Sequence, residues 1–232
     1  MKAAAIITAA GSGERMGGSI KKPYILLQGI PLLGRTLQVF AQAPDIAELI
    51  VTVNPGQEDF CRQQVITGCA IAKTVTVVAG GRRRQDSVRN GLAAVSESVD
   101  MIMIHDGARP FVTVPMIGDA LEATRHKRAT TMAVPVKDTV TIVAKDTAVI
   151  QQTLERDSLY LIQTPQTFER ELICEAHRRA CAEGFAGTDD ASLVERLGVP
   201  VTVIMGSYDN IKITTQEDLL FAEAILHRRL HT

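Results

Sequence analysis

The chain has 232 residues, of which 46% are hydrophobic and 22% charged, and its formal net charge is −1. Such a chain can bury a large core without disulfides or metals, so we expect a single domain spanning residues 1–232. The near-zero charge argues against general binding to nucleic acid or anionic lipid. No apolar run approaches the ~20 residues of a membrane span, and the N-terminus lacks a signal-peptide pattern, so we expect a cytoplasmic protein that binds no membrane.

Apolar, β-rich runs alternate with helical patterns in the first part of the chain. In chain order we expect a strand at Ala4–Ile7, a helix at Leu32–Ala41, a strand at Leu49–Val53, a helix at Gln57–Val65, a strand at Val75–Val78, a helix at Gln85–Val95, a strand at Met101–Ile104, a helix at Val114–Arg125 and a strand at Thr131–Val136. Several of these strands are apolar at nearly every position, which is typical of a parallel sheet buried on both faces. The pattern predicts an α/β fold, a three-layer sandwich with a mostly parallel, Rossmann-like sheet.

The alternation then breaks. Lys137–Val143 and Ala148–Leu154 both have strand patterns and are joined by the turn-like Ala144–Thr147, so residues 137–156 are expected to form an inserted β-hairpin. An isolated hairpin is barely stable in water. It should therefore pack on its own domain or on a second subunit, and these residues alone favour neither.

The last part of the chain returns to the α/β pattern. We expect a short polar turn at Gln163–Thr167, a helix at Glu169–Ala182, a capped helix from Thr188, a strand at Val201–Met205 and a final amphipathic helix at Gln216–Leu230. No internal repeat, low-complexity segment or linker divides the chain.

Glycines follow the first strand directly. A strand, glycines and then a helix are a common phosphate-binding arrangement, because backbone amides and the helix dipole face the anion. Counted from Gly11, the Walker loop and the dinucleotide fingerprint both fail at Met16. Arg15 and Lys22 add cationic side chains to the loop, which suits a bound triphosphate.

A buried strand ends at His105 and is followed by Asp106 and Gly107. Ligands of open α/β sheets bind beyond the carboxyl ends of strands, so Asp106 could hold Mg²⁺ and Arg109 a second anionic group. The alternative is that Asp106 caps the helix starting near Val114 and pairs with Arg109. We expect His105 to be packed rather than to be a ligand.

A second glycine turn precedes the helix near Gln85–Val95. Its backbone could read a base at Gly81, and Ser87 could add a hydrogen bond. Arg82, Arg83 and Arg84 are consecutive, so they cannot all face one site, and we expect at least one to be solvated.

The cysteines form no C-x-x-C pair. Cys61, Cys69, Cys174 and Cys181 are therefore expected to be buried or surface thiols rather than metal ligands or disulfides.

Taken together, these segments resemble the 2-C-methyl-D-erythritol 4-phosphate cytidylyltransferase family. The matching motifs run in the family's order from Ala9 to Thr214: A-A-G-S-G-E-R-M, K-K-P-Y, G-G-R-R-R-Q-D-S-V, H-D-G-A-R-P, V-P-V-K-D-T-V, R-D-S-L-Y-L-I-Q-T-P-Q-T-F, T-D-D-A-S-L-V-E and D-N-I-K-I-T. Each motif is moderately specific, but eight in order are highly specific.

The resemblance implies that CMP passes from CTP to methylerythritol phosphate, with Mg²⁺ as cofactor and pyrophosphate as second product. Arg15 and Lys22 would stabilise charge at the α-phosphorus, while Arg156 and Lys212 would position the substrate phosphate. The family order around the lysine is Pro-Lys-Gln-aromatic, so Lys21 could share the role of Lys22.

The other contacts are implied by matching positions. Those to CTP are Ala9, Ala10, Gly11, Gly13, Gly81, Ser87, Asp106 and Gly107, of which Asp106 would also attend the metal; those to the methylerythritol part are Arg109, Thr139 and Thr188. The hairpin would be an arm that crosses to a partner subunit, so that Thr139 and Arg156 enter the neighbour's site in a homodimer.

Three rival functions remain to be separated. The nearest is a cytidylyltransferase acting on ribitol 5-phosphate, although the V-P-V-K-D-T and T-D-D-A-S stretches favour methylerythritol phosphate. A nicotinamide-dependent dehydrogenase conflicts with Met16 in the fingerprint. A non-catalytic nucleotide-sensing module would not need Arg15, Lys22, Arg156 and Lys212 in one cleft.

Overall fold

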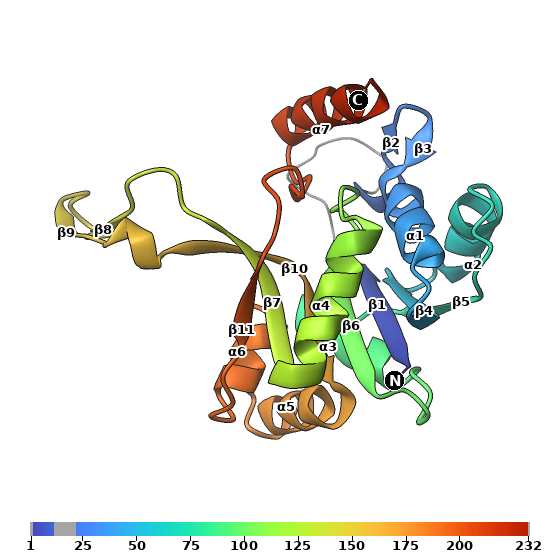
Figure 1. The fold of residues 1–232 in the computed structure, drawn as a ribbon, viewed down its shortest axis with the longest axis horizontal. Helices are drawn as coiled ribbons and strands as arrows, with labels where there is room; N and C mark the ends of the chain where they lie inside the picture. The colour runs from blue at the N-terminus through green and yellow to red at the C-terminus, as the bar shows by residue number, and fades with distance from the viewer. Residues whose placement is uncertain (1, 12–21, 232) are drawn as a thin grey trace.

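The computed structural model describes residues 2–11 and 22–231, and a seven-stranded sheet forms its centre (Figure 1). In sheet order the strands are β11 (Thr202–Met205), β7 (Ala129–Pro135), β10 (Tyr160–Glu169), β6 (Met101–Asp106), β1 (Ala3–Ala9), β4 (Ile46–Val53) and β5 (Val75–Ala79). The pairs are parallel except those of β10, which runs antiparallel to both β6 and β7. The predicted mostly parallel sheet is confirmed.

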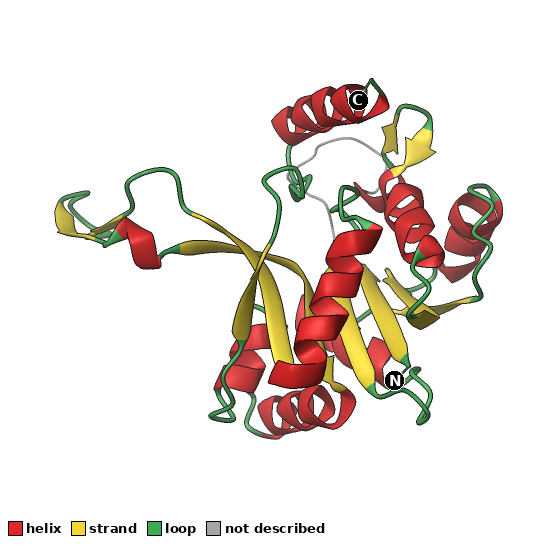
Figure 2. Ribbon diagram, viewed as in Figure 1, coloured by secondary structure: helices red, strands yellow, loops and turns green. Residues whose placement is uncertain are grey.

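Helices cover both faces of this sheet (Figure 2). One face carries α1 (Leu32–Gln42), α2 (Glu58–Cys61) and α4 (Val114–Lys127), and the other carries α3 (Arg84–Leu92), α5 (Arg170–Ala182) and α6 (Asp190–Glu195). α7 (Gln216–Leu230) packs beside the small β2–β3 hairpin (Leu26–Leu27 and Ile30–Pro31) over a third apolar cluster. The chain is thus a three-layer α/β sandwich, as predicted.

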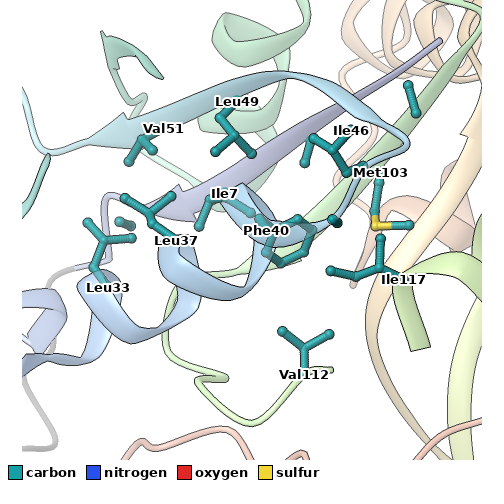
Figure 3. Packing of buried hydrophobic residues seen from close by; sticks show 14 of the residues in the cluster. Ile7, Leu33, Leu37, Phe40, Ile46, Leu49, Val51, Met103, Val112 and Ile117 are labelled. Carbon is teal, nitrogen blue, oxygen red and sulfur yellow. The ribbon is translucent and has the colours of Figure 1, made fainter. Parts of the chain in front are cut away.

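The central strands are apolar throughout because both of their faces are buried. Ile7 of β1 contributes to the cluster that contains Leu33, Leu37 and Phe40 of α1 (Figure 3), whereas its neighbour Ile6 contributes to the cluster on the opposite face. Successive side chains of a strand point to opposite faces, so an uninterrupted apolar run supplies both layers. Each fully buried side chain of this size stabilises the fold by roughly 1.5–3 kcal/mol.

One predicted element is wrong. Gln163–Thr167 forms the buried middle of strand β10 rather than a polar turn. The strand interior accepts these polar side chains because they have partners: Gln163 Nε2 donates to the Ser207 carbonyl at 2.8 Å, and Gln166 Nε2 donates to Thr131 Oγ1 at 3.1 Å. A buried polar group that is hydrogen-bonded avoids most of its desolvation cost.

Smaller differences occur at other element ends. The helix expected at Gln57–Val65 begins as α2 and continues as a π-helical segment at Arg62–Thr67. The cap of α6 is Asp189, whose side chain accepts from the Ser192 amide at 2.9 Å. The β2–β3 hairpin was not predicted.

The predicted hairpin is present as β8 (Thr141–Val143) and β9 (Ile150–Thr153), which pair antiparallel. Figure 1 shows this arm, residues 137–156, projecting away from the sheet and its helices. Its apolar side chains are open to solvent in the single chain, with Val149 and Ile150 60% and 62% exposed. Among the described residues no helix combines the length and apolar character needed to span a membrane.

Candidate active site

A cleft of about 830 Å³ opens where β1 and β6 end. This is the carboxyl-end edge at which α/β sheets bind ligands. Its lining comprises Thr8, Ala9, Ala10, Gly11, Lys22, Pro23, Asn54, Gly81, Arg82, Arg83, Arg84, Ser87, Asp106, Gly107, Ala108, Lys212 and Thr214. The sequence prediction that the glycine turns and the Asp106 strand end share one site is therefore consistent with the geometry.

Asp106, the last residue of β6, is surrounded by cationic side chains. Its Oδ1 accepts from Arg84 Nε at 3.1 Å, and its Oδ2 lies 2.8 Å from Lys212 Nζ and 3.6 Å from Arg109 Nε. Burial alone would raise the pKa of Asp106, but attraction by Arg84 and then by Lys212 and Arg109 outweighs it and holds the pKa below its usual range. Asp106 is therefore a permanent anion at physiological pH.

The segment that carries Lys212 is held in place by hydrogen bonds of Asn210. The buried Asn210 donates through Nδ2 to the Thr164 carbonyl at 2.9 Å, and its own carbonyl accepts from Arg109 Nη1 at 2.8 Å. These bonds attach the loop after β11 to β10 and to the segment after β6. Lys212 therefore reaches the cleft from a well-supported backbone.

Lys22 enters the cleft from a 3₁₀ turn at Lys22–Tyr24. Pro23 and Tyr24 of this turn are buried, and the Tyr24 ring packs edge-on against Phe60 at 4.8 Å between centroids. The apolar anchor holds the start of the turn at the mouth of the cleft.

The second glycine turn is shaped by close packing. A Cβ on Gly80 would lie 2.3 Å from the Cβ of Ala10, so glycine lets this turn approach the loop after β1. Ser87 Oγ accepts from the Gly81 amide at 3.0 Å and donates to the Arg83 carbonyl at 3.2 Å. The Ser87 hydroxyl thus shapes the turn that was expected to read a base.

All three consecutive arginines border the cleft, so the expectation that they cannot all face one site is wrong, whereas Arg82 and Arg83 are exposed, as expected for at least one of them. Arg83 pairs with Asp86 at 3.1 Å, and its side chain is 51% exposed. Arg84 instead turns inward and bridges Asp106 and Asp190, the latter through Nη1 at 2.6 Å. The sequence analysis did not single out Arg84 or Asp190 as site residues. The sequence signal that could have identified Arg84 was its spacing. Arg84 precedes the buried Ser87 and Val88 by three and four residues, so it lies on the same face of the helix.

His105 is packed, as predicted. It is fully buried, its Nε2 lies 3.1 Å from the Arg109 carbonyl and its Nδ1 lies 3.0 Å from Thr164 Oγ1. Burial lowers its pKa to about 4, so the imidazole is neutral. The suggestion that Asp106 caps the helix at Val114 is wrong, since Thr113 caps α4 by accepting from the Met116 amide. The suggested pairing of Asp106 with Arg109 is present.

The cleft gathers most of the predicted site residues. Those bordering it are Ala9, Ala10, Gly11, Lys22, Gly81, Ser87, Asp106, Gly107 and Lys212. Gly13 and Arg15 lie outside the described residues, as does Lys21. Arg109 lies behind Asp106, with 11% of its side chain exposed.

Thr139, Arg156 and Thr188 do not border the cleft within this chain. Thr139 and Arg156 are exposed on the arm, where Arg156 Nη1 donates to the Lys137 carbonyl at 3.2 Å. Thr188 is exposed two residues before Asp190. The structure of one chain therefore leaves the roles of all three as predictions.

No group of three or more His, Cys, Asp or Glu side chains that could hold a metal occurs within residues 2–11 and 22–231. The four cysteines are free thiols, as predicted, with Cys61 buried and Cys181 exposed. Burial raises the pKa of Cys61 to about 12, so this thiol stays protonated.

Comparisons with known proteins agree with the geometry. The family described as 2-C-methyl-D-erythritol 4-phosphate cytidylyltransferase matches residues 3–228. The protein of that name from Geobacter metallireducens is 47% identical over 229 residues, which cover 97% of this chain and 98% of the relative.

Solved structures give the same result. The crystal structure of 4-diphosphocytidyl-2C-methyl-D-erythritol synthase from Anaerococcus prevotii superposes with a TM-score of 0.87 at 36% identity, covering 97% of this chain and 96% of that one. The 2-C-methyl-D-erythritol 4-phosphate cytidylyltransferase from Thermus thermophilus gives a TM-score of 0.80 at 33% identity, with coverages of 98% and 100%. This chain therefore belongs to the 2-C-methyl-D-erythritol 4-phosphate cytidylyltransferase family.

Proposed function

We propose that this chain transfers CMP from CTP to 2-C-methyl-D-erythritol 4-phosphate, releasing pyrophosphate, as a step of non-mevalonate isoprenoid biosynthesis in the cytoplasm. Residues 1–232 act as one nucleotidyltransferase domain. The observation that carries the proposal is the cleft lined by Lys22, Lys212 and the glycines Gly11 and Gly81, with Asp106 at the end of a central strand. Family membership supplies the identity of the two substrates.

The chemistry needs cations more than a base. A phosphate oxygen of methylerythritol phosphate attacks the α-phosphorus of CTP, a new P–O bond forms, and the bond to pyrophosphate breaks. The attacking phosphate is already an anion, so the barrier arises largely from repulsion between two negatively charged groups. Preorganised positive groups lower such a barrier most where charge concentrates in the transition state.

Each cationic residue has a part in this proposal. Lys22, together with Arg15, stabilises the charge that develops around the α-phosphorus. Lys212, supported through Asn210, leaves Asp106 to hold the phosphate of methylerythritol phosphate, and Arg156 holds the same phosphate from a second chain. The backbone around Ala10, Gly11 and Gly81 receives the nucleotide.

The cleft also fits Mg²⁺. Asp106 is the one carboxylate among the described residues that line it, and its Oδ2 is shared only with Lys212 and the more distant Arg109. A magnesium ion is commonly held by one or two carboxylates together with substrate phosphates. Bound there, it would neutralise triphosphate charge beside Asp106 while Lys212 turns to the second substrate.

The active protein is proposed to be a homodimer with shared sites. The arm exposes apolar side chains, among them Val143, Val149 and Ile150, that an isolated hairpin cannot bury. An arm that crosses to a second chain would cover them and bring Thr139 and Arg156 to the partner's cleft. Thr188 and Arg109 would complete the contacts to the methylerythritol part.

The decisive experiment measures pyrophosphate release from CTP in the presence of Mg²⁺ and one polyol phosphate at a time. We expect release with methylerythritol phosphate and none above background with ribitol 5-phosphate. Release with ribitol 5-phosphate alone would replace the proposed acceptor. Calorimetric CTP binding without pyrophosphate release from either acceptor would instead favour a nucleotide-sensing module. A thermal shift with NAD(H) or NADP(H) would favour a dehydrogenase.

A further inference from the structure

A bridge of charged side chains runs from the wall of the cleft, at Asp106 and Arg84, to the buried Asp190. We propose that Arg84, held from behind by Asp190, is a positioning residue that fixes the orientation of the Asp106 carboxylate for transfer. This inference rests on the proposed function. It assigns a role in that reaction to Arg84 and Asp190, which the reasoning from the glycine loops and from the arm did not identify as site residues.

Arg84 joins the two carboxylates through different nitrogens of one guanidinium. Its Nε donates to Asp106 Oδ1 at 3.1 Å, and its Nη1 donates to Asp190 Oδ2 at 2.6 Å. The two aspartates are 6% and 1% exposed. Because the guanidinium is planar and rigid, a carboxylate anchored at one edge fixes the direction of the donor at another edge. A lysine side chain has a single ammonium group and no second donor held rigidly to the first.

Asp190 is itself held firmly. Its Oδ1 lies 3.0 Å from His177 Nε2, within the layer formed by α5 and α6. The backbone amides of Asp190 and Ala191 both donate to Gln166 Oε1 at 3.1 Å, which attaches the start of α6 to strand β10. The anchor of the bridge is therefore fixed to the centre of the sheet.

The two carboxylate oxygens of Asp106 have different partners. Arg84 and Thr8 Oγ1, which lies 3.3 Å away, engage Oδ1, and Lys212 engages Oδ2 at 2.8 Å. Fixing Oδ1 stops the carboxylate from rotating, so Oδ2 keeps one direction in the cleft when Lys212 turns to the second substrate. In an electrostatic site this preorganisation favours the transition state, since the carboxylate does not have to reorient as charge develops.

The experiment compares Arg84→Lys and Asp190→Asn with controls on the same helices. Arg84→Lys keeps the charge and Asp190→Asn keeps the volume, so both preserve the packing. The controls are Arg89→Lys on α3 and Glu195→Gln on α6, neither of which borders the cleft. We expect kcat to fall by about 10- to 100-fold in the two bridge variants, as for other residues that orient a reacting group. The controls should stay within about twofold.

Two further readouts separate positioning from general damage. CTP affinity from calorimetry should change by less than about threefold in Arg84→Lys, since the residue acts through Asp106 on the transfer step. In an Asp106→Asn background, Arg84→Lys should lower kcat by less than about twofold, because the residue that it orients is already lost. Should Arg84→Lys fail to fold, Asp190→Asn carries the same cycle.

The inference is overturned if Arg84→Lys retains full kcat, or if its effect multiplies unchanged with that of Asp106→Asn. It is also overturned if kcat and CTP affinity fall by the same factor. An active wild-type chain with any of these results defeats the inference alone. A wild-type chain that releases no pyrophosphate defeats the proposed function and this inference with it.

Discussion

Asp106 lines the cleft, and its carboxylate contacts the side chains of Thr8, Arg84, Arg109 and Lys212. Arg156 instead lies on the exposed arm and donates to the backbone of its own arm. The first residue is positioned by its own chain alone. The second has the side chain expected of a phosphate ligand but is not among the residues that line the described cleft of its own chain. The contrast is the reason for proposing that one chain builds the nucleotide half of the site and that a second chain adds Arg156 to the acceptor half.

The largest effect is expected on the cleft side. Lys212→Ala should lower kcat by about 10²–10³, equivalent to roughly 2.7–4 kcal/mol, because it removes a preorganised positive group from the transition state. CTP affinity should change far less, since Asp106 keeps Arg84 and Arg109. Steady-state kinetics together with calorimetric CTP binding check this. Lys127→Ala, at the exposed C-terminal end of α4, is the control. Equal losses of kcat and CTP affinity would contradict the role.

On the arm side, Arg156→Ala should be inactive alone and partly rescued in a mixture. Combined with Lys22→Ala, about a quarter of the sites should regain both residues if two chains pair at random about a two-fold axis and share each site. Pyrophosphate release from mixed and unmixed samples measures this. Mixed dimers that form, as shown by differently tagged chains, without any recovered activity would place Arg156 outside the partner's cleft.

A charge on the arm should change association more than folding. Ile150→Lys places an ammonium where an apolar side chain is expected to be covered, so the dimer should weaken at least about 10-fold in sedimentation equilibrium. The unfolding free energy of the single chain should move by less than about 0.5 kcal/mol, as for other exposed positions. Leu220→Lys on α7 is the matched control, because Leu220 is 67% exposed in the single chain and lies outside the arm. If only the control dissociated, the arm would not be the interface.

The smallest expected effect concerns the reactivity of the buried and exposed cysteine thiols toward alkylation. Only the thiolate reacts with alkylating reagents, and burial raises the pKa of Cys61 to about 12, so Cys61 should react only after unfolding. Cys181 is exposed and should react in the native protein. Mass spectrometry of the native chain treated with iodoacetamide at neutral pH checks the order. Native labelling that persists unchanged in Cys181→Ser would contradict it.

The framework of the fold could be predicted from the sequence because its cause is local. Runs such as Ala4–Ile7 and Met101–Ile104 are apolar at successive positions, and only a strand covered on both faces uses such a run fully. Pro115 fits the first turn of α4 for an equally local reason, since that position needs no amide donor.

Strand β10 could not be predicted in this way. Gln163 and Gln166 look like turn residues until their partners are known, and those partners come from Ser207, Asn210 and the start of α6. No local pattern contains contacts over such separations.

The site was predictable in part for the same reason. Glycines and strand ends identify a phosphate site by position, so Gly11, Gly81 and Asp106 could be found. Arg84 is the same residue type as Arg82 and Arg83 and differs from them only because α3 begins at Arg84. Its proposed role depends on the carboxylate of Asp190, more than a hundred residues away in the sequence.

Strand β10 also limits how the arm can be exchanged between related proteins. It leaves the foot of the arm at Tyr160 and pairs with β7 from Tyr160 to Ile162 and again from Gln166 to Phe168. In the middle of the sheet Gln166–Glu169 also pair with β6. The hairpin alone is therefore not a transplantable part. A chimera that exchanges the arm between relatives would have to carry the continuous segment 129–169, together with matching residues at Asn210 and at the start of α6.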